Sequence, residues 1–270
     1  MADILRLTAS RRHPSCTEKS SRGRDGDERV EVAKRRRRIH VPGQNALLTA
    51  LPEKELQRLV PRLETVSMHV RDLAHEAHQP IPDIYFPLSG VISLVLVMAD
   101  GLTTEIATIG NEGMIGLSVY LGTDSSPYRA FCQVPGEMLR MSAEDFADEL
   151  GHDGPMQGIL KRYNQALLSQ LAYSVACNRL HSVEERMCRW LLMTHDRVGA
   201  DQFPLTQEFL AQMLGVRRPS VTVAAGVLQK AGLIAYARGR VVILDRPRLE
   251  AASCECYQAV RDELERLLLG

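Results

Sequence analysis

The sequence has no long apolar run, no leader-like start and no dense set of cysteines. Its longest apolar stretches, such as residues 91–99, fall well short of the ~20 residues that a membrane-spanning helix needs. The first residues lack the basic start, apolar core and small-residue cleavage site of a secretory signal. The six cysteines are scattered over 270 residues, which is not a disulfide framework and suits a reducing compartment. We therefore expect a cytoplasmic protein that makes no contact with membranes.

The motifs of common enzymes are also missing. The sequence contains no phosphate-binding glycine loop, no nucleophile elbow and no paired metal-ligand motif. The segment from Gly110 to Gly113 has the residues of a turn between strands rather than those of a dinucleotide-binding loop. We expect neither enzymatic activity nor catalytic residues.

The formal net charge is zero, but the charges are segregated along the chain. Residues 1–42 carry a net charge of +6 and show no apolar periodicity, so we expect a disordered basic arm. A solvated tail is the favoured interpretation of this arm, and contact with DNA phosphates is the alternative. Residues 203–248 carry +5, whereas residues 43–202 carry −8. A basic segment joined to an acidic body is a reason to look for nucleic-acid binding in residues 203–248.

Apolar residues make up 45% of the chain, which is enough for a sizeable core. A helix is expected over residues 45–63, where leucines recur at helical spacing. Beyond it, short runs rich in Val, Ile and Leu alternate with turn signals. These runs cover residues 84–87, 91–99, 103–109, 114–121, 129–134 and 137–141. Short strands at this spacing predict an antiparallel sandwich or barrel-like roll, and with the helices that follow they predict an α+β fold.

A long helix is predicted from about residue 155. Its apolar positions, largely on one face, are Leu160, Leu167, Leu168, Leu171, Val175 and Leu180. A second copy of the chain is the simplest partner for this face, and the roll of the same chain is the alternative. Ser182 and Glu185 then form a capping box that starts another helix, so we place a domain boundary there.

Residues 203–244 have the pattern of two short helices and a hairpin. Thr206 is placed to cap the first helix, and Gly215 to make the turn after it. The second helix begins around Pro219. Its inward face consists of Val221, Ala224, Ala225 and Leu228. Residues 237–240 then turn a hairpin, and the whole pattern predicts a winged helix-turn-helix.

The outward face of the second helix carries the residues that we expect to bind DNA. In a major groove, Arg217 or Arg218 can read guanine while the other binds a phosphate. Ser220 and Thr222 can hydrogen-bond to phosphates or base edges, and Val223 can contact a thymine methyl group. Wing arginines would bind phosphates, which sets register without reading sequence. The predicted set is Thr206, Gln207, Arg217, Arg218, Pro219, Ser220, Thr222, Val223, Arg238 and Arg240.

Several motifs are shared with one family of regulators. Residues 205–211 read LTQEFLA, followed by Gly215 and residues 217–222 (RRPSVT), while residues 84–90 read IYFPLSG, followed by Gly101, Glu105 and residues 110–116 (GNEGMIG). With these motifs the chain resembles the Crp/Fnr family of bacterial transcription regulators.

The resemblance covers about residues 46–250 and implies an organisation for most of the chain. After the arm it implies a cyclic-nucleotide-binding-like β-roll over residues 43–154 and a long dimerisation helix over 155–181. A winged helix-turn-helix then covers 182–250, and beyond the resemblance we expect a C-terminal helix over 251–270. The resemblance also implies a homodimer bound to double-stranded DNA at a pseudo-palindromic site, with RNA polymerase as a further candidate partner.

The sequence departs from the family's cyclic-nucleotide binders at the expected pocket. Those proteins have a Gly-Glu pair and later an Arg-Ser or Arg-Ala pair, whereas here Gly113 and Gly116 are followed by Arg129 and Ala130. Arg129 can still pair with a phosphate, but the glutamate that would hold a ribose hydroxyl is absent. We expect a degenerate effector pocket at these four residues. An unknown effector, or none, is favoured over a cyclic nucleotide, and the sequence identifies no cofactor, with haem left open.

Two further departures concern DNA sequence and metals. Nucleotide-responsive members carry an arginine where this chain has Val223, so its preferred DNA sequence should differ. Oxygen-sensing members use an N-terminal cysteine cluster, but only Cys16 lies there and such a cluster needs four thiolates. Cys254 and Cys256 form a short dithiol, for which reduced cysteines in a C-terminal helix are favoured over an oxidation sensor. We therefore expect no metal site.

The leading hypothesis is a sequence-specific transcription regulator modulated through the roll. The competing hypothesis is a ligand-binding or scaffolding protein whose helical C-terminal domain binds a protein partner. Salt dependence separates the two, because binding through arginine–phosphate contacts weakens steeply as salt rises.

Overall fold

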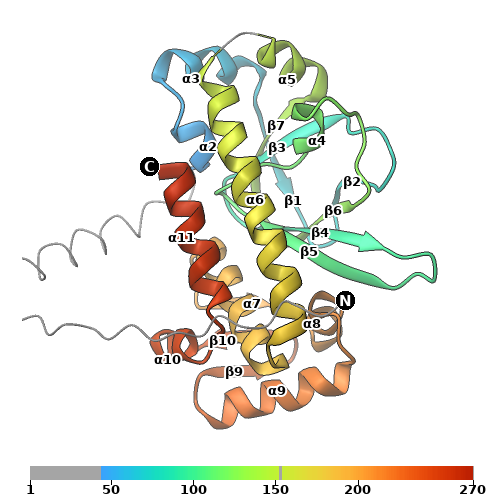
Figure 1. Cartoon of the computed structure of the whole chain (residues 1–270), viewed down its shortest axis with the longest axis vertical. Helices are drawn as coiled ribbons and strands as arrows, with labels where there is room; N and C mark the ends of the chain where they lie inside the picture. The colour runs from blue at the N-terminus through green and yellow to red at the C-terminus, as the bar shows by residue number, and fades with distance from the viewer. Residues whose placement is uncertain (1–43, 152–153, 270) are drawn as a thin grey trace, which may run out of the picture. The chain divides into compact units, whose positions relative to one another are not determined.

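The computed structural model describes residues 44–151 and 154–269, and the basic arm expected at 1–42 lies outside them (Figure 1). The first elements are the helices α2 (Ala46–Thr49) and α3 (Glu53–Leu59) and the 3₁₀ helix η1 (Val60–Arg62). The expectation of one helix over 45–63 is therefore wrong. Pro52 lacks an amide hydrogen and stands in extended backbone before α3, which separates the two helices.

Seven antiparallel strands form the roll. They are β1 (Glu64–Met68), β2 (Leu73–His75), β3 (Asp83–Pro87), β4 (Val91–Val97), β5 (Thr103–Ile109), β6 (Arg129–Val134) and β7 (Gly136–Ser142). One sheet has the order β1-β7-β3 and the other β2-β6-β4-β5. The apolar side chains of the two sheets share one core, which includes Phe86, Ile92 and Met138. The predicted roll is confirmed, and β3 to β7 lie where the apolar runs place them.

Residues 114–121 do not form the strand expected there. The segment contains the short helix α4 (Leu117–Tyr120). Before this helix, Ile115 forms an isolated β-bridge to Tyr85 of β3. Gly116 has a φ of +93°, which breaks the extended backbone before α4. The apolar run predicts burial correctly, since Met114, Ile115 and Leu117 are buried, but it does not distinguish a strand from a helical turn.

The long helix is α6 (Pro155–Leu180), preceded by α5 (Ala143–Leu150). Figure 1 shows α11 (Cys256–Leu269) lying alongside α6, and the two helices run antiparallel: Arg162 Nε donates to the Leu267 carbonyl at 2.9 Å. The predicted apolar face is divided. Leu160 and Leu167 are buried in the core of the roll, whereas Leu168, Val175 and Leu180 are exposed.

The remaining elements form a second core. They are α7 (Val183–Val198), β8 (Gln202–Pro204), α8 (Gln207–Leu214), α9 (Arg218–Lys230), β9 (Ile234–Ala237), β10 (Arg240–Ile243) and α10 (Arg246–Ala251). The sheet order is β8-β10-β9. Strands β9 and β10 form the predicted hairpin, and β8, which was not predicted, pairs with β10. Ser182 and Glu185 make the predicted capping box at the start of α7. Within the described residues, no helix is long and apolar enough to cross a membrane.

Candidate nucleic-acid interface

The turn between α8 and α9 is built as the sequence predicts. The Thr206 hydroxyl accepts a hydrogen bond from the Phe209 amide at 3.1 Å and so caps α8. Gly215 ends α8 with a φ of +61°, a conformation that other residues adopt only at a cost. The guanidinium of Arg186, on α7, donates to the carbonyl of Leu214 and holds the end of α8. The four predicted inward residues of α9 are all buried. The two helices are therefore fixed relative to each other.

The opposite face of α9 is open to solvent. Arg217, Arg218, Pro219, Ser220, Thr222 and Val223 are all exposed. Val223 is 63% exposed, although it is apolar. The Thr222 hydroxyl donates to Oε1 of Gln207 at 2.8 Å, which ties the first turn of α8 to α9. A single exposed surface thus joins the N-terminal parts of both helices.

The wing stands beside this surface. Arg238 and Gly239 connect β9 to β10 with φ values of +51° and +72°, the pattern of a tight two-residue hairpin turn. Both residues line a hollow of about 270 Å³ together with Thr206, Gln207 and Arg218. The structure therefore brings these predicted residues of α8, α9 and the wing together. Arg240 is also exposed, at the start of β10.

Tyr236 of β9 is part of this hollow and was not predicted. Its hydroxyl donates to the Leu205 carbonyl at 3.0 Å, and its backbone amide donates to Oε1 of Gln229 of α9 at 2.9 Å. Burial raises the pKa of Tyr236 to about 12. Its side chain therefore stays neutral and fixes the wing to the segment before α8. The sequence signal for this role was a tyrosine, an apolar ring with a polar hydroxyl, just before the hairpin turn.

The four residues predicted for an effector pocket have other contacts in the structure. A Cβ atom on Gly113 would lie 2.3 Å from the Tyr163 hydroxyl, and Gly116 packs against Ile84, so both glycines serve close packing. Ala130 is fully buried in the core. Arg129 Nε donates to Oε1 of Glu76 at 2.8 Å.

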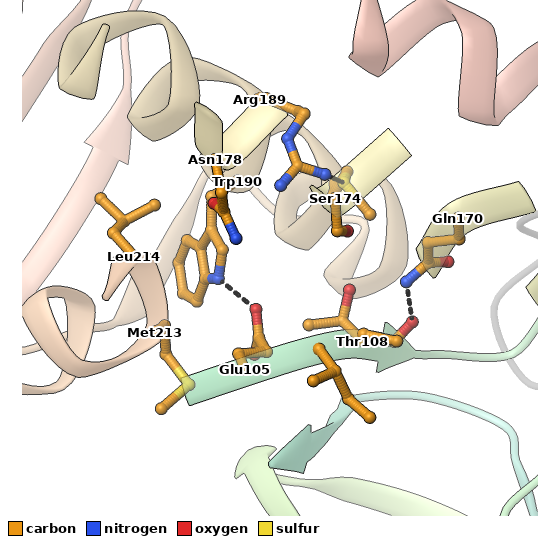
Figure 2. Close-up of a pocket in the computed structure, with 12 residues that line it drawn as sticks. Glu105, Thr108, Gln170, Ser174, Asn178, Arg189, Trp190, Met213 and Leu214 are labelled. Atoms are coloured by element: carbon orange, nitrogen blue, oxygen red, sulfur yellow. Dashed lines mark hydrogen bonds between the residues drawn. The ribbon is translucent and has the colours of Figure 1, made fainter. Parts of the chain in front are cut away.

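Sequence reasoning missed the contacts between the roll and α7. Figure 2 shows the indole of Trp190 directed at the carboxylate of Glu105 on β5, with an Nε1–Oε1 distance of 2.8 Å. The Ser93 hydroxyl donates to the other carboxylate oxygen at 2.8 Å. Desolvation raises the pKa of Glu105 to about 7. Gln170 of α6 lies in the same pocket and donates to the Thr108 carbonyl at 3.0 Å.

A second link is a buried ion pair between Glu112, in the loop after β5, and Arg197 of α7. Arg197 Nη2 lies 2.6 Å from Oε1 of Glu112, and both side chains are 3% exposed. Arg197 also donates to the Thr108 carbonyl at 3.1 Å. Gly110 makes room for this arginine, since a Cβ atom there would lie 2.5 Å from its side chain. No local sequence pattern identifies such a pair, because its members are 85 residues apart.

Two protein-family models match the chain. The cyclic nucleotide-binding domain matches residues 72–153, and the Crp-like helix-turn-helix domain matches residues 185–252. No curated protein sequence is similar enough to match.

Solved structures share the fold at low sequence identity. FixK2 from Bradyrhizobium japonicum superposes with a TM-score of 0.61 at 16% identity, covering 71% of this chain and 98% of that one. A putative Crp/Fnr-family regulator from Eubacterium rectale gives 0.60 at 19% identity, covering 76% and 96%. The c-di-GMP-responsive regulator CLP from Xanthomonas campestris gives 0.57 at 17% identity, covering 72% and 100%. With a cyclic nucleotide-binding domain followed by a Crp-like helix-turn-helix domain, the chain belongs to the Crp/Fnr family of DNA-binding transcription regulators.

Proposed function

We propose that this protein is a sequence-specific regulator that binds a pseudo-palindromic DNA site as a homodimer. The observation that carries the proposal is the exposed surface shared by α9, the start of α8 and the wing. Arg217 and Arg218 stand at the N-terminus of α9, where the helix dipole also favours phosphate. Arg238 and Arg240 flank them on the wing as phosphate contacts. No acidic side chain is among the residues that line the hollow between α9 and the wing.

Residues at the start of α9 would read the bases. An arginine can bind guanine O6 and N7 with two hydrogen bonds, and we assign this role to Arg218 because its side chain lines the hollow between helix and wing. Thr222 and Ser220 supply hydroxyl groups on the same helix. Val223 supplies a methyl surface for thymine, which differs from the charged contact of nucleotide-responsive relatives.

The homodimer would form through α6. Leu168, Ala172 and Val175 follow one another at i, i+4 and i+7 and are all exposed, with 52% for Leu168 and 73% for Val175. This spacing is that of a coiled-coil seam. The opposite face of α6 is occupied by the roll and α11, so the exposed seam is the part that a second copy would bury. Two copies would present their α9 helices to half-sites about one turn of DNA apart.

Regulation would pass through the roll. We retain the expected division into a roll (43–154), a dimerisation helix (155–181), a winged domain (182–250) and a C-terminal helix (251–270). Glu105 and Glu112 connect the roll to α7, so a change in β5 or the following loop would alter the position of the DNA-binding domain. A phosphate-bearing ligand at Arg129 would compete with the carboxylate of Glu76, which already accepts a hydrogen bond from Nε of this arginine. This competition favours an effector other than a cyclic nucleotide. RNA polymerase and a cytoplasmic location remain predictions.

Selection of binding sites from a random duplex library tests the proposal. We expect the purified protein, at near-physiological salt without added ligand, to enrich a two-fold-symmetric motif. In Arg218→Ala the same selection should lose preference at one position of each half-site, because a guanine contact accounts for about 1–3 kcal/mol. Lys54→Ala, an exposed cation on α3, is the matched control and should enrich the unchanged motif.

An unchanged motif in Arg218→Ala would contradict the assignment of this arginine. If no sequence is enriched, the selection is repeated with cyclic nucleotides and cyclic dinucleotides to test for an inactive ligand-free state. Failure in every condition, together with partner capture that does not weaken as salt rises, would favour the competing protein-binding function.

A further inference from the structure

Three cysteines and one histidine meet at the end of α6. Cys177 lies in the last turn of that helix and His181 is its C-cap, while Cys254 precedes α11 and Cys256 begins it. The Sγ atoms of Cys177 and Cys254 are 3.5 Å apart, and Cys256 Sγ lies 3.7 Å from Nδ1 of His181. All four candidate ligand atoms lie within 4.8 Å of one another. The three cysteines are buried.

The fold explains this convergence. Cys177 and His181 are four residues apart in sequence, and the end of α6 places them on one side. Cys254 and Cys256 flank Glu255 and also face a common side. The antiparallel packing of α11 on α6 then joins two pairs that are 77 residues apart in the chain.

The second nitrogen of His181 is also held. Its Nε2 lies 3.1 Å from the carboxylate of Glu255, while Nδ1 faces the cysteines. A carboxylate on the far nitrogen fixes the tautomer and orients the ring, which is the usual outer-shell arrangement around a histidine that binds a metal. The sequence Cys254-Glu255-Cys256 thus supplies two inward thiols and one outward partner for the histidine.

The surroundings can balance the charge of thiolates. Arg186 and Arg189 of α7 are buried, and among the described residues neither Nε atom has a hydrogen-bond partner. Both arginines interact electrostatically with Cys177. These two cations are therefore placed to offset negative charge on the buried sulfur atoms. Thiolates are the form of cysteine that binds metals.

We propose that Cys177, His181, Cys254 and Cys256 bind one Zn²⁺ ion in a closed, four-coordinate structural site. Zinc favours tetrahedral sites of this Cys₃His composition. Around such an ion, with bonds of about 2.3 Å, two sulfur ligands lie roughly 3.8 Å apart, close to the separations here. A [4Fe–4S] cluster spreads its four ligands over four iron atoms and a [2Fe–2S] cluster over two, so four ligand atoms within 4.8 Å of one another fit a single ion better. This site would overturn the expectation of no metal.

The site would lie where four helices meet, at the boundary between the roll and the DNA-binding part. His181 is the C-cap of α6, and the next residue, Ser182, caps α7. Cys254 follows α10, and Cys256 begins α11. One ion would therefore fix the chain after the winged domain to the joint between α6 and α7.

Metal analysis of the full-length protein, purified without chelators, tests the proposal. We expect one zinc per chain in the wild type and a loss of zinc in Cys254→Ser/Cys256→Ser. Cys188→Ser, a buried cysteine of α7 outside the cluster, is the control and should retain zinc. Replacement of zinc by Co²⁺ should give the visible absorption of a tetrahedral thiolate site. Circular dichroism checks that each variant is folded.

A second variant tests the site without altering a ligand. Glu255 is 79% exposed at its side chain, so Glu255→Gln should fold normally. It should bind zinc about 10–100-fold more weakly in a chelator competition. Wild-type protein without bound zinc that also fails to take up added Zn²⁺ or Co²⁺ would overturn the proposal. So would a disulfide between Cys177 and Cys254 as the native state, or an iron chromophore in protein prepared without oxygen.

Discussion

The charge state of Glu105 depends on its burial between β5 and α7. Its carboxylate accepts hydrogen bonds from Ser93 and Trp190, yet desolvation outweighs them and raises its pKa from 4.5 to about 7. The folded protein therefore holds this proton more tightly than the unfolded chain does. Stability from this group is fully present below pH 4.5 and is lost as the pH rises through about 7.

Glu105→Gln should remove this pH dependence, because glutamine keeps the acceptor for Trp190 and does not ionise. We expect the variant to gain stability relative to the wild type when the pH is raised from about 5 to about 8. Urea denaturation of both proteins at the two pH values measures the change. Glu144→Gln, an exposed carboxylate of α5, is the control. An equal difference between Glu105→Gln and the wild type at both pH values would show that Glu105 titrates normally.

At the scale of elements, local sequence patterns predicted where helices begin and end. Contacts between residues far apart in the sequence could not be predicted. The start and the end of α8 follow from Thr206 and Gly215, and the start of α9 follows from Pro219, because each of these residues acts within one turn. The run at 114–121 failed because burial alone does not distinguish strand from helix. The face of α6 was predicted as one seam, but α11 and the roll bury part of it, and their arrival depends on the tertiary fold.

The exposed seam of α6 leads to a prediction about assembly. If the protein is the homodimer proposed above, Leu168→Asp/Val175→Asp should convert it to a monomer, because the charges would face each other across the paired helices. Analytical ultracentrifugation measures the mass. Leu102→Asp is the control, since Leu102 is 68% exposed in the turn between β4 and β5. A dimer that persists in the double variant would exclude this face as the interface.

At the scale of the whole molecule, two of the polar contacts that join the roll to α7 are buried: Trp190 with Glu105, and Arg197 with Glu112. The sequence predicted both parts, yet none of these contacts, because Glu112 and Arg197 carry no local signal of pairing. The same holds for the four-residue cluster at the end of α6. Its dithiol was visible in the sequence, whereas its partners Cys177 and His181 became relevant only through helix packing.

Arg197→Met should destabilise the protein by about 3–5 kcal/mol, because it leaves the carboxylate of Glu112 buried without its ion-pair partner. Glu112→Gln/Arg197→Met should recover much of this loss, since the buried charge is then removed as well. The free energy of unfolding in urea measures both. Equal destabilisation of the single and double variants would show that packing of the arginine, rather than its charge, holds the contact.

The return of α11 to α6 has a consequence for the order in which the chain folds during synthesis. Val260, Leu264, Leu267 and Leu268 belong to the same apolar core as Phe86 and Met138 of the roll. Most of the roll leaves the ribosome early, but its core gains these four side chains only after the whole winged domain has been translated. A nascent chain that ends before residue 256 would carry α6 with the α11-facing surface uncovered, and such intermediates are candidates for chaperone binding.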